Sequence, residues 1–211
     1  MNAPTLAQGL AALHIDLPET VQAKLQAFAH LLQKWNRVYN LTSIRDPGQI
    51  LTHHLLDSLA VLPQLGGIER LADVGSGGGL PGIPLAIATL GRQVPLAVTS
   101  IETVNKKASF QQQARIELGL ANFTVLNERV ENVRPDVPFD AVISRAFSEL
   151  ADFVGLTQHL LRPGGRFLAM KGVYPDDEIA RLPVGFRVVA ALPLSVPGLD
   201  AERHLIIVEK S

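Results

Sequence analysis

Asp73-Val74-Gly75-Ser76-Gly77-Gly78-Gly79-Leu80-Pro81-Gly82 indicates the fold class of this chain. This glycine-rich turn follows the apolar run Leu71–Val74 and precedes Ile83–Ala88, which we expect to be helical. A turn between a buried strand and a helix lies at the edge where open α/β sheets bind their ligands. Glycine reaches positive φ there and lets a ligand approach the backbone closely. The stretch therefore predicts a ligand site at the edge of a parallel sheet.

Short apolar runs alternate with helical stretches through the rest of the chain. We expect buried strands at Leu71–Val74, Leu96–Ile101, Phe123–Leu126, Phe139–Ser144 and Phe167–Met170. We expect helices at Ile83–Ala88, Asn105–Leu118 and Glu149–Leu161. This alternation is typical of an α/β fold with a mostly parallel, doubly wound sheet. Val188–Leu192 and His204–Glu209 predict an antiparallel hairpin that completes seven strands.

The N-terminal part has a helical pattern instead. One apolar stripe is formed by Val21, Leu25, Phe28, Leu32 and Trp35, at helical spacing. A second helix is expected over Ile50–Leu62, with Leu51, Leu55 and Leu59 on one face. We therefore expect a helical cap over residues 1–65 and a sheet domain over residues 66–211, together one compact unit.

The composition limits the classes of function. The chain has 211 residues, 47 % hydrophobic and 18 % charged, which is enough for one core. With 19 Lys and Arg against 20 Asp and Glu, a strong overall basic field for RNA is excluded, but a local basic patch is not. The absence of cysteine excludes disulfides, thiolate zinc sites and cysteine nucleophiles.

Two further expectations concern metals and membranes. His53 and His54 are adjacent, so on a helix they point about 100° apart, and no carboxylate–histidine set completes a metal site with them. No run of about 18 apolar residues is present, and the start lacks the pattern of a targeting segment. We expect a cytoplasmic protein that binds no metal and no membrane.

Three ligands are conceivable at the glycine-rich turn. A P-loop requires Lys-Ser/Thr after the last glycine, where Ile83-Pro84 stands. The spacing Gly77-x-Gly79-x-x-Gly82 matches a dinucleotide pattern, but prolines 81 and 84 lack the N–H groups that a pyrophosphate needs. S-adenosylmethionine carries cations and no phosphate, so a carboxylate at Asp73 favours it. An NAD-type oxidoreductase and a small-molecule methyltransferase remain alternatives.

Two features that the chain lacks argue against two kinds of methyl acceptor. Methylation of pyrimidine carbon 5 normally needs a cysteine. Methylation of an exocyclic amine usually uses an Asn/Asp-Pro-Pro-aromatic turn after the fourth strand, where Ser144-Arg145-Ala146-Phe147 stands. Guanine N7 has an available lone pair, so alignment in a dry pocket suffices. We therefore assign no catalytic acid or base.

Basic residues gather at the predicted strand ends, where they would meet RNA phosphates beside Phe147, which can stack on a base. They are Arg45, His53, His54, Lys106, Lys107, Arg129, Arg145, Lys171, Arg203 and His204. Arg145 and Lys171 end buried strands next to the turn and are the candidate substrate-orienting residues. The candidate RNA-binding residues are Arg203, His204, His53 and Lys106.

Several stretches, spread nearly from end to end, match one family, and the combination of the His53–Leu59 helix, Ser144–Phe147 and Arg203–Leu205 is specific to it. The matching stretches are Trp35-Asn36, Tyr39–Thr42, His53–Leu59, Asp73–Pro84, Lys106-Lys107, Arg129–Glu131, Ile143–Phe147, Met170–Gly172 and Glu202–Leu205. With them the chain resembles the glucose-inhibited division protein B family, bacterial methyltransferases that modify guanine N7 in 16S ribosomal RNA. The resemblance implies the class I, Rossmann-like methyltransferase fold and the assembled small ribosomal subunit as substrate.

The resemblance also implies a cofactor site. S-adenosylmethionine, with S-adenosylhomocysteine as product, would be bound by Gly75, Leu80, Val130, Glu131 and Arg145. Glu102 ends the second strand, where a carboxylate can accept hydrogen bonds from both ribose hydroxyls. Asp73, Gly77 and Gly79 complete the expected cofactor residues. We expect a monomer whose partner is 16S rRNA.

Overall fold

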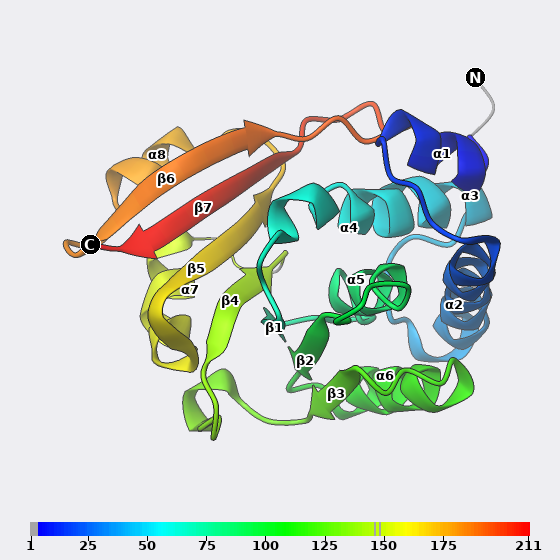
Figure 1. Cartoon of the computed structure of the whole chain (residues 1–211), viewed down its shortest axis with the longest axis horizontal. Coiled ribbons are helices and arrows are strands. Elements are labelled where there is room, and N and C mark those ends of the chain that lie inside the picture. Colours follow the sequence, from blue (N-terminus) through cyan, green and yellow to red (C-terminus); the bar gives the residue numbers. More distant parts are fainter. Residues whose placement is uncertain (1–3, 146, 148) are drawn as a thin grey trace.

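The strands form one mixed sheet in the order β3-β2-β1-β4-β5-β7-β6 (Figure 1). The computed structural model describes residues 4–145, 147 and 149–211. The strands are β1 Arg70–Val74, β2 Ala97–Ile101, β3 Phe123–Leu126, β4 Phe139–Ser144, β5 Leu161–Lys171, β6 Phe186–Pro193 and β7 His204–Lys210. β1 to β5 pair in parallel, whereas β7 is antiparallel to β5 and to β6. The predicted seven-stranded, doubly wound sheet with its C-terminal hairpin is confirmed.

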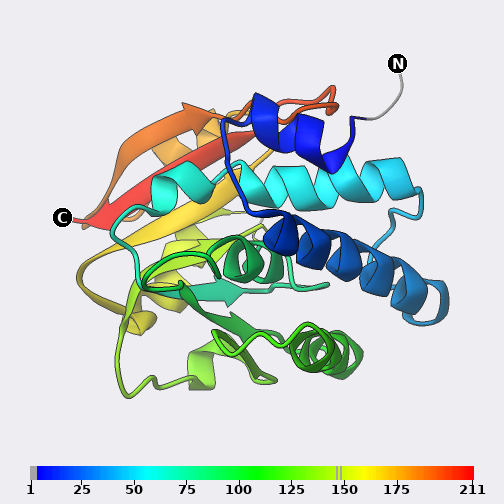
Figure 2. The same cartoon turned by 45° about the vertical axis from the view of Figure 1, so that its right-hand side comes forward.

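Helices cover both faces of this sheet. They are α1 Leu6–Ala12, α2 Glu19–Tyr39, α3 Pro47–Ile50, α4 Asp57–Leu59, α5 Gly82–Ala88, α6 Asn105–Glu117, α7 Leu150–Thr157 and α8 Asp176–Ala180. A π-helical turn, Leu51–Leu56, joins α3 to α4. The helices α5 and α6 share one face with the N-terminal helices, and α7 and α8 lie on the other (Figures 1 and 2).

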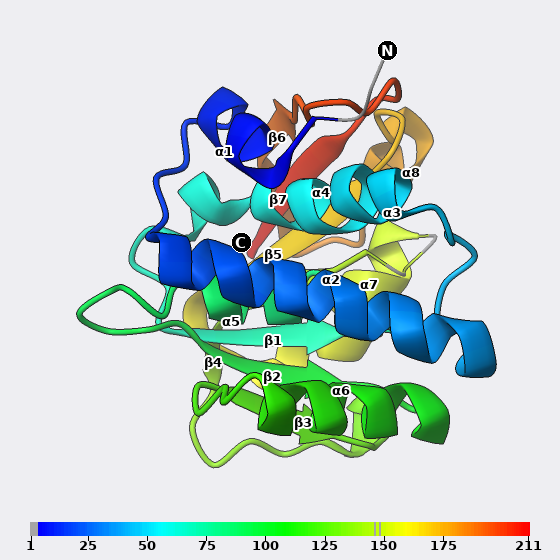
Figure 3. The same ribbon diagram turned by 90° about the vertical axis from the view of Figure 1, so that its right-hand side faces the viewer.

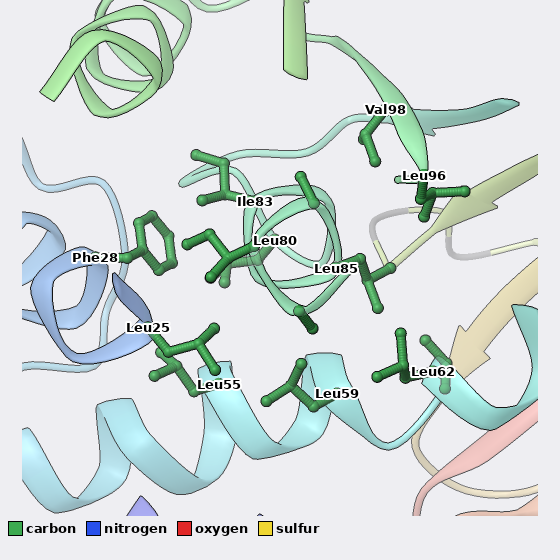
Figure 4. Close-up of a cluster of buried hydrophobic side chains, with 14 of the residues drawn as sticks. Leu25, Phe28, Leu55, Leu59, Leu62, Leu80, Ile83, Leu85, Leu96 and Val98 are labelled. Carbon is green, nitrogen blue, oxygen red and sulfur yellow. The ribbon is translucent and has the colours of Figure 1, made fainter. Parts of the chain in front are cut away.

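The N-terminal helices are part of the main core. In α2, Leu25 and Phe28 are fully buried and belong to the same apolar cluster as Ile83 and Leu85 of α5 (Figure 4). The helix α2 runs along the outer side of α5, between α4 and α6 (Figure 3). The predicted stripe of α2 is thus its buried face, and Trp35 at its end contacts the ring of Phe110 in α6.

The expected helix Ile50–Leu62 differs from the structure in its start, its end and its geometry. It begins at Pro47, whose fixed φ suits the first turn, and Asp46 accepts a hydrogen bond from the Gln49 amide as its N-cap. It then widens into the π-helical turn and ends at Leu59. Carbonyl oxygens in this turn accept hydrogen bonds from groups other than the helix's own backbone amides. The carbonyl oxygen of His53, for example, accepts a hydrogen bond from the Arg145 side chain. Such inserted donors are an established cause of helix distortion.

The expected helix Glu149–Leu161 is also too long. The helix α7 ends at Thr157, and a single 3-10 turn leads into β5, which starts at Leu161 rather than Phe167. The first half of β5 is polar and rich in glycine, so it lacks the apolar run by which strands are predicted. A Cβ at Gly165 would lie 3.1 Å from the Asp140 carbonyl oxygen, so the two strands approach closely there.

Candidate functional site

The glycine-rich turn follows β1, and three of its residues adopt the left-handed backbone conformation. Gly75, Gly77 and Gly79 have φ angles of 71°, 59° and 78°. Residues with a Cβ atom are strained in this region of φ, which explains why glycine occupies these positions. The Gly75 amide donates to the carbonyl of Ile101 at 2.9 Å, so the turn starts at the shared end of β1 and β2.

Glu102 holds the middle of the turn. Its Oε2 accepts from the Gly77 amide at 2.7 Å, and its Oε1 accepts from the Val104 amide at 2.8 Å. The residue is only 4 % exposed. A carboxylate has about four acceptor positions, so each oxygen keeps one for a further donor such as a ribose hydroxyl. The predicted ribose-binding acid thus also shapes the turn.

Gln111 is a second support of the turn and was not among the predicted site residues. From α6, its Nε2 donates to Ser76 Oγ and to the Gly77 carbonyl oxygen, both at 2.8 Å. Its Oε1 accepts from the hydroxyl of Ser100 in β2. Gln111 is fully buried. A glutamine on the buried face of a predicted helix was the available signal, because a buried amide needs partners.

Asp73 anchors the far end of the turn. The residue is fully buried, and its Oδ2 accepts from the Gly82 amide at 2.8 Å. Its Oδ1 has no hydrogen-bond partner among the residues that the structure describes. Burial raises the pKa of Asp73 to about 7, with the Gly82 hydrogen bond opposing the shift. The side chain therefore organises the turn from inside the protein.

A cavity of about 250 Å³ opens at the ends of β1 and β2, and we call it the glycine-turn cavity. It is lined by Val74, Gly75, Ile101, Thr103, Glu128, Arg129, Val130, Glu131 and Phe147. The structure thus brings three predicted cofactor residues together, namely Gly75, Val130 and Glu131. Leu80 lies elsewhere, since its side chain is buried in the apolar core near Phe28 (Figure 4).

A second cavity, of about 360 Å³, lies between the π-helical turn and the ends of β4 and β5, and we call it the cationic cavity. It is lined by Ile44, His53, His54, Asp57, Arg145, Met170, Lys171, Gly172 and Arg203. Both candidate substrate-orienting residues, Arg145 and Lys171, are there. Two candidate RNA-binding residues, Arg203 and His53, are there too, although they are far apart in the sequence.

Lys171 ties the loop after β4 to α8. Its Nζ donates to the Phe147 carbonyl oxygen at 2.9 Å and to Glu178 Oε2 at 2.6 Å. The same Glu178 oxygen accepts from the Leu150 amide at the start of α7 at 2.8 Å. Lys171 therefore positions this loop as well as lining the cationic cavity.

The histidines near the cationic cavity have different surroundings. His54 is buried, and its Nε2 lies 2.9 Å from Thr42 Oγ1. Burial, followed by the nearby charge of Arg145, lowers the pKa of His54 to about 4, so its ring is neutral at pH 7. His204 packs edge-on against Tyr174 and reaches the Gly172 carbonyl oxygen at 2.7 Å.

The remaining predicted features lie outside the two cavities. Lys106 is exposed on the first turn of α6.

Across the described parts of the chain, no set of three His, Cys, Asp or Glu residues is arranged to hold a metal ion. Within the same residues, no helix has the length and apolar character that crossing a membrane requires. Ala146, in the predicted Ser144–Phe147 stretch, lies outside the described residues.

The structure resembles solved methyltransferases. It matches a glycopeptide N-methyltransferase, MtfA, complexed with S-adenosyl-L-methionine, with a TM-score of 0.60 and 14 % identity over 75 % of this chain and 94 % of that one. It matches TrmN from Thermus thermophilus with a TM-score of 0.57 and 22 % identity over 76 % of this chain and 53 % of that one. These likenesses support the class I, Rossmann-like fold.

Sequence comparisons identify the family. The family model described as rRNA small subunit methyltransferase G matches residues 21–206. A protein of Aromatoleum aromaticum named ribosomal RNA small subunit methyltransferase G is 78 % identical over 211 residues and the full length of both chains. One of the same name from Azoarcus sp. is 64 % identical over 99 % of this chain and 96 % of its own. These matches do not favour the oxidoreductase or small-molecule alternatives, and the chain belongs to the rRNA small subunit methyltransferase G family.

Proposed function

We propose that this protein transfers the methyl group of S-adenosylmethionine to N7 of a guanine in the 16S rRNA of the small ribosomal subunit. The observation that carries the proposal is the position of the loop after β4. Phe147 of this loop lines the glycine-turn cavity, and Arg145, two residues earlier, lines the cationic cavity. One short loop thus separates a site suited to the cofactor from a site suited to RNA. Membership of the family supports the same reaction.

The glycine-rich turn and the glycine-turn cavity beside it fit this cofactor. A Cβ at Gly77 would meet no atom within 4 Å, so a ligand has room in front of the turn. When bound, the cofactor supplies an electrophilic methyl group on a positively charged sulfur. Gly75, Val130 and Glu131 would surround the adenosine, and Glu102 would accept from its ribose. Asp73, Gly79 and Leu80 would act through the shape of the turn.

The cationic cavity fits the nucleic acid. The arginines that line it match the acceptor atoms of RNA, which are phosphate oxygens and guanine O6. Arg145 would orient the guanine, and Lys171 would hold the loop through the Phe147 carbonyl oxygen. Arg203, His53, His204 and Lys106 would contact the RNA around it. The N7 lone pair needs no proton removed, so this chain acts by alignment rather than by acid–base catalysis.

The same proposal sets the cellular context. Small ribosomal subunits are in the cytoplasm, so we place the protein there, as a monomer that meets one subunit at a time. A net charge of −1 agrees with a preformed RNA surface that is recognised by a local patch. We assign residues 1–65 to a cap that supplies His53 to the RNA site, and residues 66–211 to the methyltransferase domain.

The test is a methyl-transfer assay with radiolabelled S-adenosylmethionine and small subunits that lack the modification. We expect label in 16S rRNA and chemical cleavage at a single N7-methylguanine. Arg145→Ala should abolish most of the labelling. Arg162→Ala is the matched control, because this arginine pairs with Asp140 at the opposite edge of the sheet and should leave labelling intact. Label on another base, on protein or on neither would refute the proposal.

A further inference from the structure

We infer that Asp57 is a positioning residue that holds Arg145 and Arg203 in the arrangement that binds RNA. The inference rests on the proposed function and concerns the cationic cavity. Asp57 Oδ2 accepts from Arg145 Nη1 at 2.8 Å, and Asp57 Oδ1 accepts from Arg203 Nε at 2.9 Å. One carboxylate of α4 thus holds two guanidinium groups, one after β4 and one before β7, that are 88 and 146 residues away in the sequence.

Asp57 is itself held in place. Its side chain is 3 % exposed, and it directly follows the π-helical turn. The carbonyl oxygen of His53, in that turn, accepts a second hydrogen bond from Arg145 Nη1 at 3.1 Å. Isolated π-helical turns are frequent at functional sites. The helix distortion therefore presents a carbonyl oxygen and a carboxylate to the same guanidinium nitrogen.

The two arginines keep donors for a ligand. A guanidinium has five N–H groups, and Asp57 engages only one nitrogen of each. Among the described residues, Arg145 Nε and Nη2 and Arg203 Nη2 have no hydrogen-bond partner. Both arginine side chains are 24 % exposed and line the cationic cavity. These donors suit a group that only accepts hydrogen bonds, such as a phosphate or guanine O6.

A purely structural role explains this arrangement less well. Burying a carboxylate costs solvation energy that a buried ion pair recovers only in part, and apolar residues would join the cap to the sheet at least as firmly. What apolar residues would not do is restrict two long cationic side chains before RNA arrives. Fixing flexible side chains in advance removes an entropy cost from binding. The role of the Asp57 carboxylate is therefore to fix the two arginine side chains before RNA binds.

The experiment measures the affinity for undermethylated small subunits by filter binding and the KM of methyl transfer. Asp57→Asn keeps the size of the side chain and loses its charge. We expect Kd and KM for the subunit to rise about tenfold, with S-adenosylhomocysteine affinity, measured by calorimetry, unchanged. Asp140→Asn is the matched control, because Asp140 pairs with Arg162 and with two backbone amides far from the cavity. It should lower thermal stability and leave Kd unchanged.

A double variant separates positioning from a general loss of structure. In an Arg203→Ala background, Asp57→Asn should weaken subunit binding clearly less than it does in the wild-type protein. One of the two arginines that Asp57 holds is then already absent. If Asp57→Asn does not fold, Asp57→Glu retains the charge but displaces the carboxylate, and it should still raise Kd.

Three results would overturn the inference. They are a folded Asp57→Asn or Asp57→Glu with wild-type Kd, equal losses of subunit and S-adenosylhomocysteine affinity, and strictly additive effects in the double variant. The failure of the proposed function is distinguishable from these. A wild-type protein that binds subunits without methylating them would refute the reaction, while the Kd values would still decide the role of Asp57.

Discussion

The amide of Gly77 donates a 2.7 Å hydrogen bond to the carboxylate of Glu102, which lies 25 residues further along the chain. The turn after β1 is therefore shaped by the residue that follows β2. Parallel strands make this possible, since their carboxyl ends meet at one edge of the sheet. The candidate ligand site and its support thus share residues, and we expect substitutions there to change both ligand binding and stability.

Glu102→Gln should weaken cofactor binding and the fold together. A glutamine has one acceptor oxygen where Glu102 uses two, so the Gly77 or Val104 amide loses its partner. We expect a loss of about 1–3 kcal/mol in unfolding free energy and about tenfold or more in S-adenosylhomocysteine affinity. Urea unfolding and calorimetry measure these quantities. Glu117→Gln, on the exposed end of α6, is the control, and wild-type values for Glu102→Gln would contradict the prediction.

Gly77→Val should block cofactor binding by bulk in front of the turn. Gly77 has a φ of 59°, so valine also strains the backbone, by about 1–3 kcal/mol. Gly67→Val separates the two effects, because Gly67 has a φ of 75° and equally open surroundings but precedes β1. Both variants should lose similar stability in urea, and only Gly77→Val should lose S-adenosylhomocysteine binding in calorimetry. Retained binding by Gly77→Val would count against the site.

Gly82→Ala should destabilise the protein through Asp73. The added Cβ would lie 2.6 Å from Asp73 Oδ2, and that oxygen is held by the Gly82 amide itself. Overpacking of this kind costs about 1–3 kcal/mol of unfolding free energy. Gly155→Ala in α7 meets no atom within 4 Å and should instead stabilise the helix by about 0.5–1 kcal/mol. Thermal unfolding of both variants tests the difference in sign.

Asp73 should make stability fall as pH rises. Its pKa is raised from 3.8 to about 7 by burial, so between these values the folded state holds a proton that the unfolded state has lost. The stabilisation is complete below about pH 4 and is lost as pH rises through 7. Asp73→Asn cannot titrate, so the difference in unfolding free energy between wild type and variant should decline from pH 5 to pH 8. A difference independent of pH would show that Asp73 does not titrate in this range.

His54 should have the opposite effect. Its pKa is lowered from 6.5 to about 4, chiefly by burial, so the unfolded state binds a proton that the folded state excludes. The stabilisation is present above pH 6.5 and is lost as pH falls towards 4. Relative to His54→Gln, the wild-type protein should lose unfolding free energy as pH is lowered through this range. Urea unfolding at a series of pH values measures this change, for His54 as for Asp73. An unfolding free energy that rises as pH is lowered, as expected for Asp73, would contradict the lowered pKa of His54.

The predictable parts of the fold share one property. Strands such as β1 and β4 are buried on both faces, so each is a continuous apolar run in the sequence. The first half of β5 and the π-helical turn have no such pattern. The former depends on the close approach to β4 at Gly165, and the latter coincides with the hydrogen bond from Arg145 to the His53 carbonyl oxygen.

The candidate site was predictable to the same degree. Gly75 lies in the turn after β1 and was expected at this edge of the sheet from the sequence pattern, whereas Val130 was expected at the cofactor site from the resemblance to the family. Both line the glycine-turn cavity. Asp57, Gln111 and Glu178 were not expected to act there. Each is recognised only by its partners in space, and no local pattern connects Asp57 with Arg203, which is 146 residues away.

The amino-acid sequence alone was enough to predict the order of strands and helices, the positive φ angles of the glycine-rich turn and the edge of the sheet at which the candidate site lies. These follow from local properties, namely apolar periodicity and the conformational freedom of glycine. Three-dimensional packing alone set which carboxylate holds which arginine, the complete burial of Asp73 and the lowered pKa of His54. These depend on burial and on contacts between distant segments, because solvation and charge interactions are set by neighbours in space.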